Sequence, residues 1–224
     1  MNSEIQFGPS YSLAVVRMDA GEAIQAESGS MVSMSPGIQI ETQAKGGLLG
    51  GLKRSMLGGE SFFLNTFTAA QPGEITMAPA LPGDIVHLQL TGQTMFVQSG
   101  SYMASHPSIQ VDTKWGGAKT FFSSEGLFLL KLSGSGDLFV SSYGAIREVD
   151  LAPGEQYVLD TGHMVAFSEG MTYSVRKVGG WKSTLFSGEG LVVDLTGPGR
   201  LYMQTRSPQG FLGWLIPHLP QSGS

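Results

Sequence analysis

Short apolar and alternating runs dominate the chain and predict β-strands. Most of the runs have four to seven residues and are bounded by glycine, proline or serine, which is typical of strands joined by turns. The expected strands are residues 11–16, 37–42, 62–68, 85–90, 94–98, 127–132, 138–140, 157–159, 191–195 and 201–204. The links 133–136 and 196–199 are glycine-rich, and we expect tight turns between antiparallel strands there.

A glycine spacing recurs three times along the chain. In each copy two glycines stand eight positions apart and an apolar run follows: Gly21 and Gly29, Gly92 and Gly100, Gly154 and Gly162. A glutamate opens a second apolar run in each copy, and the three form a repeated structural motif: Glu60, Glu125 and Glu189. Three copies of one unit must bury their apolar faces against one another. We therefore expect one triplicated domain over 1–206, with approximate repeats 11–79, 82–142 and 148–206.

The segment 207–224 departs from the strand pattern. Ser207 and Pro208 have the residue types of a helix N-cap and first turn, and apolar residues then recur at helical spacing as far as Pro217. This predicts a short C-terminal amphipathic helix followed by a tail. We expect the helix to cover an open end of the β core, with a contact to a second subunit and membrane insertion as the alternatives.

The composition excludes several kinds of site and disfavours one class of partner. The 224 residues include 32 glycines, about twice the usual share, which suits the turns of a many-stranded protein. The absence of cysteine excludes disulfides, thiolate metal sites and a cysteine nucleophile. A net charge of −5 disfavours a nucleic-acid partner. The first residues have no secretory signal pattern, and no apolar run is long enough to cross a bilayer. We expect a cytoplasmic protein, with peripheral attachment to a membrane left open.

Three lysine-flanked segments with paired glycines stand between the halves of the copies. They supply most of a candidate interaction face: Lys45, Leu48, Leu49, Lys53, Arg54, Lys114, Trp115, Lys119, Lys177, Trp181 and Lys182. On one interpretation these cations attract phospholipid headgroups, a phosphorylated ligand or an acidic partner. On the other, each lysine pairs across its hairpin with a repeated glutamate, as in Lys53 with Glu60.

The first of these segments carries an apolar insertion over residues 46–59. Its leucines and methionine are costly to leave in water, and its glycines allow unusual backbone shapes. We expect the insertion to dock in the centre of an oligomer, with a membrane or partner contact as the alternative. The Gly-Lys-Ser/Thr ending of a phosphate-binding loop is missing.

No catalytic, cofactor-binding or metal-binding pattern is present in the sequence. The histidines His87, His106, His163 and His218 stand singly, without a second ligand at metal-binding spacing. His163 occupies the position of Ser30 and Ser101 in the other copies, which favours a structural role. The serines lie in no Gly-x-Ser-x-Gly motif. We expect a non-enzymatic protein.

The stretch Gly58-Gly59-Glu60-Ser61-Phe62-Phe63, the repeated Ser-Gly turns and the ending Leu215-Ile216-Pro217 together resemble the AIM24 family. The resemblance covers nearly the whole chain. It implies an all-β sandwich or prism like the tryptophan RNA-binding attenuation protein, with three pseudo-repeats and a homotrimer. Mitochondrial relatives are linked to inner-membrane organisation, and no catalytic residues are established for the family.

Two functions compete on these grounds. The first is a non-enzymatic oligomeric β scaffold that binds a protein partner or an anionic membrane surface through its lysine-glycine segments. The second is a small-ligand or RNA-binding ring, suggested by the fold analogy alone. Trp115 and Trp181 would be the aromatic residues of such a ring.

Overall fold

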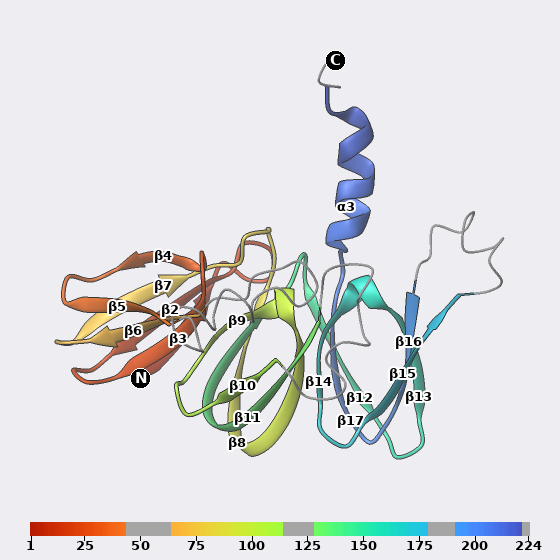
Figure 1. The fold of residues 1–224 in the computed structure, drawn as a ribbon, viewed down its shortest axis with the longest axis horizontal. Coiled ribbons are helices and arrows are strands. Elements are labelled where there is room, and N and C mark those ends of the chain that lie inside the picture. The colour runs from red at the N-terminus through yellow and green to blue at the C-terminus, as the bar shows by residue number, and fades with distance from the viewer. Residues whose placement is uncertain (44–63, 114–127, 179–190, 221–224) are drawn as a thin grey trace.

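A computed structural model describes residues 1–43, 64–113, 128–178 and 191–220. Strands make up most of the described chain, and a single short helix stands near its C-terminus (Figure 1). The named strands pair in antiparallel fashion throughout the described residues. The structure confirms the predicted all-β class and the C-terminal helix.

The strands fall into three units that lie in a row from left to right in Figure 1. The first strand, β1 (Asn2–Gln6), precedes the units and pairs with β2 (Leu13–Met18). Unit 1 contains β2 (Leu13–Met18), β3 (Ala23–Glu27), β4 (Met31–Met34), β5 (Ile38–Gln43), β6 (Leu64–Ala69) and β7 (Gly73–Met77). Unit 2 contains β8 (Ile85–Gln98), β9 (Tyr102–Ser105), β10 (Gln110–Asp112) and β11 (Leu129–Ser141). Unit 3 contains β12 (Ile146–Leu151), β13 (Gln156–Asp160), β14 (Met164–Ser168), β15 (Thr172–Lys177), β16 (Leu191–Thr196) and β17 (Gly199–Gln204).

Each unit is built from six strand segments in two small sheets. In one sheet the sixth segment lies between the first and the third, as in β2-β7-β4 and β12-β17-β14. In the other sheet the fifth segment lies between the second and the fourth, as in β3-β6-β5 and β13-β16-β15. In unit 2 the long strands β8 and β11 each supply two segments, and the pairings are the same. All three units therefore share one topology.

Short turns connect the second and third segments of each unit. Gly29, at φ +93°, lies in the turn between β3 and β4. The corresponding connections in units 2 and 3 are single 3₁₀ turns, η1 (Ser99–Ser101) and η2 (Thr161–His163). The glycines that share a position in the sequence pattern thus lie between equivalent strands.

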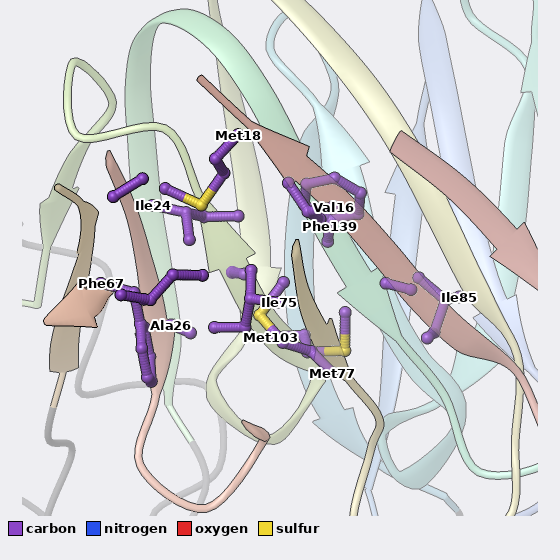
Figure 2. Close-up of a cluster of buried hydrophobic side chains, with 14 residues drawn as sticks. Val16, Met18, Ile24, Ala26, Phe67, Ile75, Met77, Ile85, Met103 and Phe139 are labelled. Atoms are coloured by element: carbon purple, nitrogen blue, oxygen red, sulfur yellow. The ribbon is translucent and has the colours of Figure 1, made fainter. Parts of the chain in front are cut away.

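The core is continuous from one unit to the next. Figure 2 shows the cluster at the junction of units 1 and 2, where Phe67 and Ile75 of unit 1 share a cluster with Met103 and Phe139 of unit 2. Buried clusters of the same kind fill units 2 and 3. Adjacent units therefore share buried side chains across their junctions.

Two of the expected turns are wrong. At 133–136 the chain stays in β11 and passes from one sheet to the other with an irregularity between Ser133 and Ser135. At 196–199 the chain also changes sheet, because β16 pairs with β13 and β15 whereas β17 pairs with β12 and β14. Glycine permits a bulged corner as readily as a hairpin turn, so the composition alone does not separate the two.

The helix α3 (Pro208–Leu215) begins and ends close to the predicted positions but does not cover the core. Ser207 is its N-cap and accepts a hydrogen bond from the Gly210 amide. A 3₁₀ turn, η3 (Ile216–His218), continues the helix. None of the α3 residues is buried, and the helix extends away from the row of units (Figure 1). The expectation that it covers an open end of the core is therefore wrong.

Candidate functional site

The three lysine-glycine segments connect equivalent pairs of antiparallel strands. Each lies between the fourth and fifth strand segments of its unit, and the hairpin bases are the pairs Gln43 with Leu64, Asp112 with Lys131, and Lys177 with Leu191. Of the candidate interaction face only Lys177 is described, as the exposed last residue of β15. The others lie outside the described residues: Lys45, Leu48, Leu49, Lys53, Arg54, Lys114, Trp115, Lys119, Trp181 and Lys182. The glutamates Glu60, Glu125 and Glu189 do so as well, and so does the 46–59 insertion.

Charges at two hairpin bases face opposite charges across the strands. Arg176, next to Lys177, makes a bidentate contact with Asp194, at 2.6 and 3.0 Å. The Asp194 carboxylate raises the pKa of the Arg176 guanidinium. In unit 2, Asp112 stands directly opposite Lys131. Since both sites are at the surface, such pairs stabilise the hairpins only weakly.

The glycine turns lie beside these hairpin bases. In unit 2 the Ser99 amide donates to the Phe128 carbonyl at 2.8 Å, and Phe128 is the first described residue after the gap. In unit 3 the Thr161 hydroxyl donates to the Leu191 carbonyl at 3.1 Å. In unit 1 the strand before the turn ends at Glu27, which pairs with Leu64. The turn and the base of the hairpin therefore lie side by side in each unit.

Adjacent units join through one kind of strand pairing. The second segment of one unit pairs with the third segment of the next, as β3 with β9 and β8 with β14. Ala26 lies opposite Ala104, and Val97 lies opposite Ala166. In both pairs the first residue stands three positions before the turn glycine of its unit, and the second stands four positions after (29 − 26, 104 − 100, 100 − 97 and 166 − 162). The two junctions therefore have the same register.

A strand at each end of the row lacks this pairing. β4 is the third segment of unit 1 and β13 is the second segment of unit 3, and each is the last strand of its sheet. The residues of β9 are all buried and so are the first four residues of β14, whereas all four residues of β4 are exposed. Val32 is 58% exposed and Met34 is 38% exposed, and Val158 of β13 is 55% exposed. These edges leave backbone groups and apolar side chains in water.

A histidine contact that the sequence did not suggest joins β1 to unit 2. His87 lies 2.7 Å from an Asp137 oxygen through Nε2 and 3.3 Å from the Ser3 hydroxyl through Nδ1. The ring also stacks on Phe139, with centroids 4.7 Å apart. These residues are far apart in sequence, so no spacing rule could have brought them together. The contacts fix the position of β1 against the first segment of β8.

Within the described residues no three histidine, aspartate or glutamate side chains gather as a metal-binding group. None of the helices in the described part of the chain has the length and apolar character needed to span a membrane.

Comparisons with known proteins place the chain among relatives that share its full extent. An uncharacterised protein of Streptococcus pyogenes serotype M6 is 28% identical over 222 residues, which is 96% of this chain and 89% of that protein. The crystal structure of another Streptococcus pyogenes protein matches with a TM-score of 0.81 and 27% identity, over 97% of this chain and 99% of that one. The model of a family described as mitochondrial biogenesis AIM24 matches residues 3–206. The chain therefore belongs to the AIM24 family.

Proposed function

We propose that this protein is a non-enzymatic scaffold that assembles head to tail through its two open edges. The β13 edge of one chain pairs with the β4 edge of the next, in the way that β3 pairs with β9 and β8 with β14 inside the chain. The observation that supports this most strongly is the exposure of all four β4 residues where the equivalent strands are buried.

The internal junctions predict the register of the contact between chains. The residue three positions before Gly162 is Leu159, and the residue four positions after Gly29 is Ser33. Leu159 of one chain would then lie opposite Ser33 of the next, and Val158 opposite Met34. Val158 and Met34 are both exposed in the single chain. Burying them removes apolar surface from water, and the new strand pairing gives hydrogen-bond partners to the backbone groups along both edges.

A heterologous contact of this kind closes into a ring or continues as a filament. We favour a closed trimer of nine units. The β4 and β13 edges of every chain are then paired, and pairing of exposed edges is one way in which β proteins avoid edge-to-edge aggregation.

The lysine-glycine segments supply the partner contact in this proposal. Each chain carries three of them, each between the fourth and fifth strand segments of its unit, so a trimer would carry nine. Weak attraction of each segment to an acidic partner or an anionic membrane surface would be multiplied by the assembly. Binding would weaken as salt is added.

A matched pair of double variants tests the assembly. Met34→Lys/Val158→Lys places like charges opposite each other at the predicted contact, and Met34→Lys/Val158→Glu places opposite charges there. Like charges facing each other across strands destabilise pairing and opposite charges stabilise it, so the dissociation constants should differ by roughly tenfold per contact. We expect native mass spectrometry to show monomers of 23.7 kDa for the first variant and trimers for the second.

The unmodified protein completes the experiment. A wild-type chain that is monomeric at tens of micromolar would contradict the proposal. Identical oligomers of both double variants would contradict the predicted register. Thermal unfolding of both variants serves as the folding control, because β4 keeps its pairing with β7 in either case.

A further inference from the structure

The segment that follows unit 3 is uncharged and largely apolar. From Ser207 to Ser224 the sequence contains no lysine, arginine, aspartate or glutamate. Four large apolar side chains of the helical part, Leu212, Trp214, Ile216 and Leu219, are between 47% and 62% exposed. A helix that exposes apolar side chains and lacks a charged face normally lies in an apolar environment.

The base of the helix is held firmly against unit 3. A side chain at Gly162 of η2 would come within 2.7 Å of the Ser207 hydroxyl, so the turn and the N-cap are in close contact. Tyr143 packs edge-on against Phe211 at 6.0 Å. An aromatic row then continues outward through Trp214 to His218, with ring centroids 6.3 and 5.3 Å apart. The helix therefore has a defined direction away from the units (Figure 1).

The size of α3 argues against a protein groove or a second copy as its main partner. The eight residues of α3 and the three of η3 together rise about 18 Å, and a cylinder of that length and about 10 Å diameter has a lateral surface of roughly 570 Å². A stable protein interface buries about 800 Å² on each partner. Even complete burial of α3 and η3 would therefore supply less than that area.

A lipid bilayer has no such area requirement and suits the residue types. Tryptophan prefers the boundary between headgroups and acyl chains, and leucine and isoleucine prefer the hydrocarbon. The rise of about 18 Å over α3 and η3 is too short to cross a hydrocarbon core about 30 Å thick. Because the segment is uncharged, its attraction to lipid is apolar and needs no anionic headgroup.

We infer that α3 and η3 form an anchor that inserts into one leaflet of a lipid bilayer. The inference rests on the proposed function for the membrane as partner, but each chain carries the whole anchor and needs neither the assembly nor the lysine-glycine segments. Assembly multiplies the number of anchors.

The test follows the fluorescence of Trp214 in the full chain. Trp115→Phe and Trp181→Phe leave Trp214 as the sole tryptophan of the three. With phosphatidylcholine vesicles we expect its emission to move to shorter wavelength, to be quenched by brominated acyl chains, and to keep this response in 1 M salt. In this background Leu212→Gln/Ile216→Gln should lower the partition coefficient at least tenfold. The matched control Phe7→Gln/Tyr11→Gln, which replaces two residues that are 69% and 74% exposed, should leave it unchanged.

Three outcomes would overturn the inference. The first is an emission spectrum that vesicles do not change. The second is emission that is already at short wavelength without lipid and shifts on dilution, because a second copy would then cover the helix. The third is binding that requires anionic lipid, is lost in salt and leaves Trp214 unaffected; this result would support the lysine-glycine segments and leave the proposed function intact. Repeating the assay with Met34→Lys/Val158→Lys added separates insertion by single chains from assembly.

Discussion

At the scale of single residues, Tyr102 shows how the core constrains an ionisable group. Its side chain is fully buried in unit 2, and its hydroxyl lies 2.8 Å from the Ser105 hydroxyl. Burial raises the pKa of the Tyr102 phenol well above 10, because the charged form would lose its hydration. Burial also raises the pKa of Tyr173 and of Tyr202.

The raised pKa of Tyr102 makes the fold sensitive to alkali. Below pH 10 the phenol is protonated in both the folded and the unfolded chain, so its contribution to stability is fully present. As the pH rises above 10, the unfolded chain releases the proton and the folded chain keeps it, so the free energy of unfolding falls by about 1.4 kcal/mol per pH unit for this group. Tyr102→Phe should flatten the decline measured by urea titrations between pH 9 and 11.

The same variant has a cost at neutral pH, since Ser105 loses a buried hydrogen-bond partner. We expect a loss of about 1 kcal/mol at pH 7. Tyr11→Phe, at an exposed position, is the control for removing a hydroxyl. An unchanged alkaline slope in Tyr102→Phe would show that Tyr102 does not couple folding to pH.

Residue patterns indicated the structural role of His163 but not the contacts of His87. His163 was expected to be structural, and it lies 2.7 Å from the Gln204 carbonyl, beside the start of the C-terminal segment. The contact of His87 with Asp137 and Ser3 went unpredicted because it depends on the approach of β1 to β8 and β11. A contact between distant strands leaves no local spacing in the sequence.

At the scale of elements, the corner in β11 determines how one strand serves two sheets. Gly134 and Gly136 have φ of +133° and +136°, a region that other residues rarely adopt. A Cβ atom at Gly134 would lie 2.5 Å from the Ser108 carbonyl oxygen. The corner therefore needs glycine for both its backbone angle and its close approach to the preceding loop.

We expect Gly134→Ala to lower the free energy of unfolding by about 3 kcal/mol, the sum of backbone strain and a clash with a backbone atom. Gly92→Ala separates the two effects, because Gly92 has φ +107° but no atom within 4 Å of the added methyl group. Its cost should be about 1 kcal/mol. Equal losses in the two variants, measured by urea denaturation, would contradict this explanation of the corner.

Strand positions could be predicted where apolar runs alternate and end at glycine, as in β2, β6 and β16. More polar strands such as β12 and β15 were missed, because an edge strand with one face in water carries a weaker signal. The length of α3 followed from its cap and proline residues. Its direction did not, since that depends on packing at Tyr143 and η2.

At the scale of the whole molecule, the three equivalent units are joined by two junctions of the same kind. The strand of each kind that would form a third junction, β4 in unit 1 and β13 in unit 3, has no partner in a neighbouring unit among the described residues. The glycine spacing predicted that the units repeat, because it is local. The spacing could not indicate that units 1 and 3 do not pair with each other, because the pairing of units depends on their arrangement in space. The candidate interaction face was predicted from composition, and of its residues only Lys177 lies in the described chain. The open edges were not recognised as a binding surface, and contact of the C-terminal helix with a subunit or a membrane was only an alternative to its covering the core.

A cross-linking measurement tests head-to-tail assembly most directly. The chain has no cysteine, so Met34→Cys/Val158→Cys introduces the only two thiols. Residues directly opposite each other in antiparallel strands have Cβ atoms about 4.5–5.5 Å apart, close to the range that a disulfide spans. The off-register variant Met34→Cys/Gln156→Cys is the control. After mild oxidation we predict a covalent trimer with no free thiol, which reduction returns to single chains, and little linkage in the control. A monomer with two free thiols, a disulfide within one chain, or equal linkage in both variants would contradict the account.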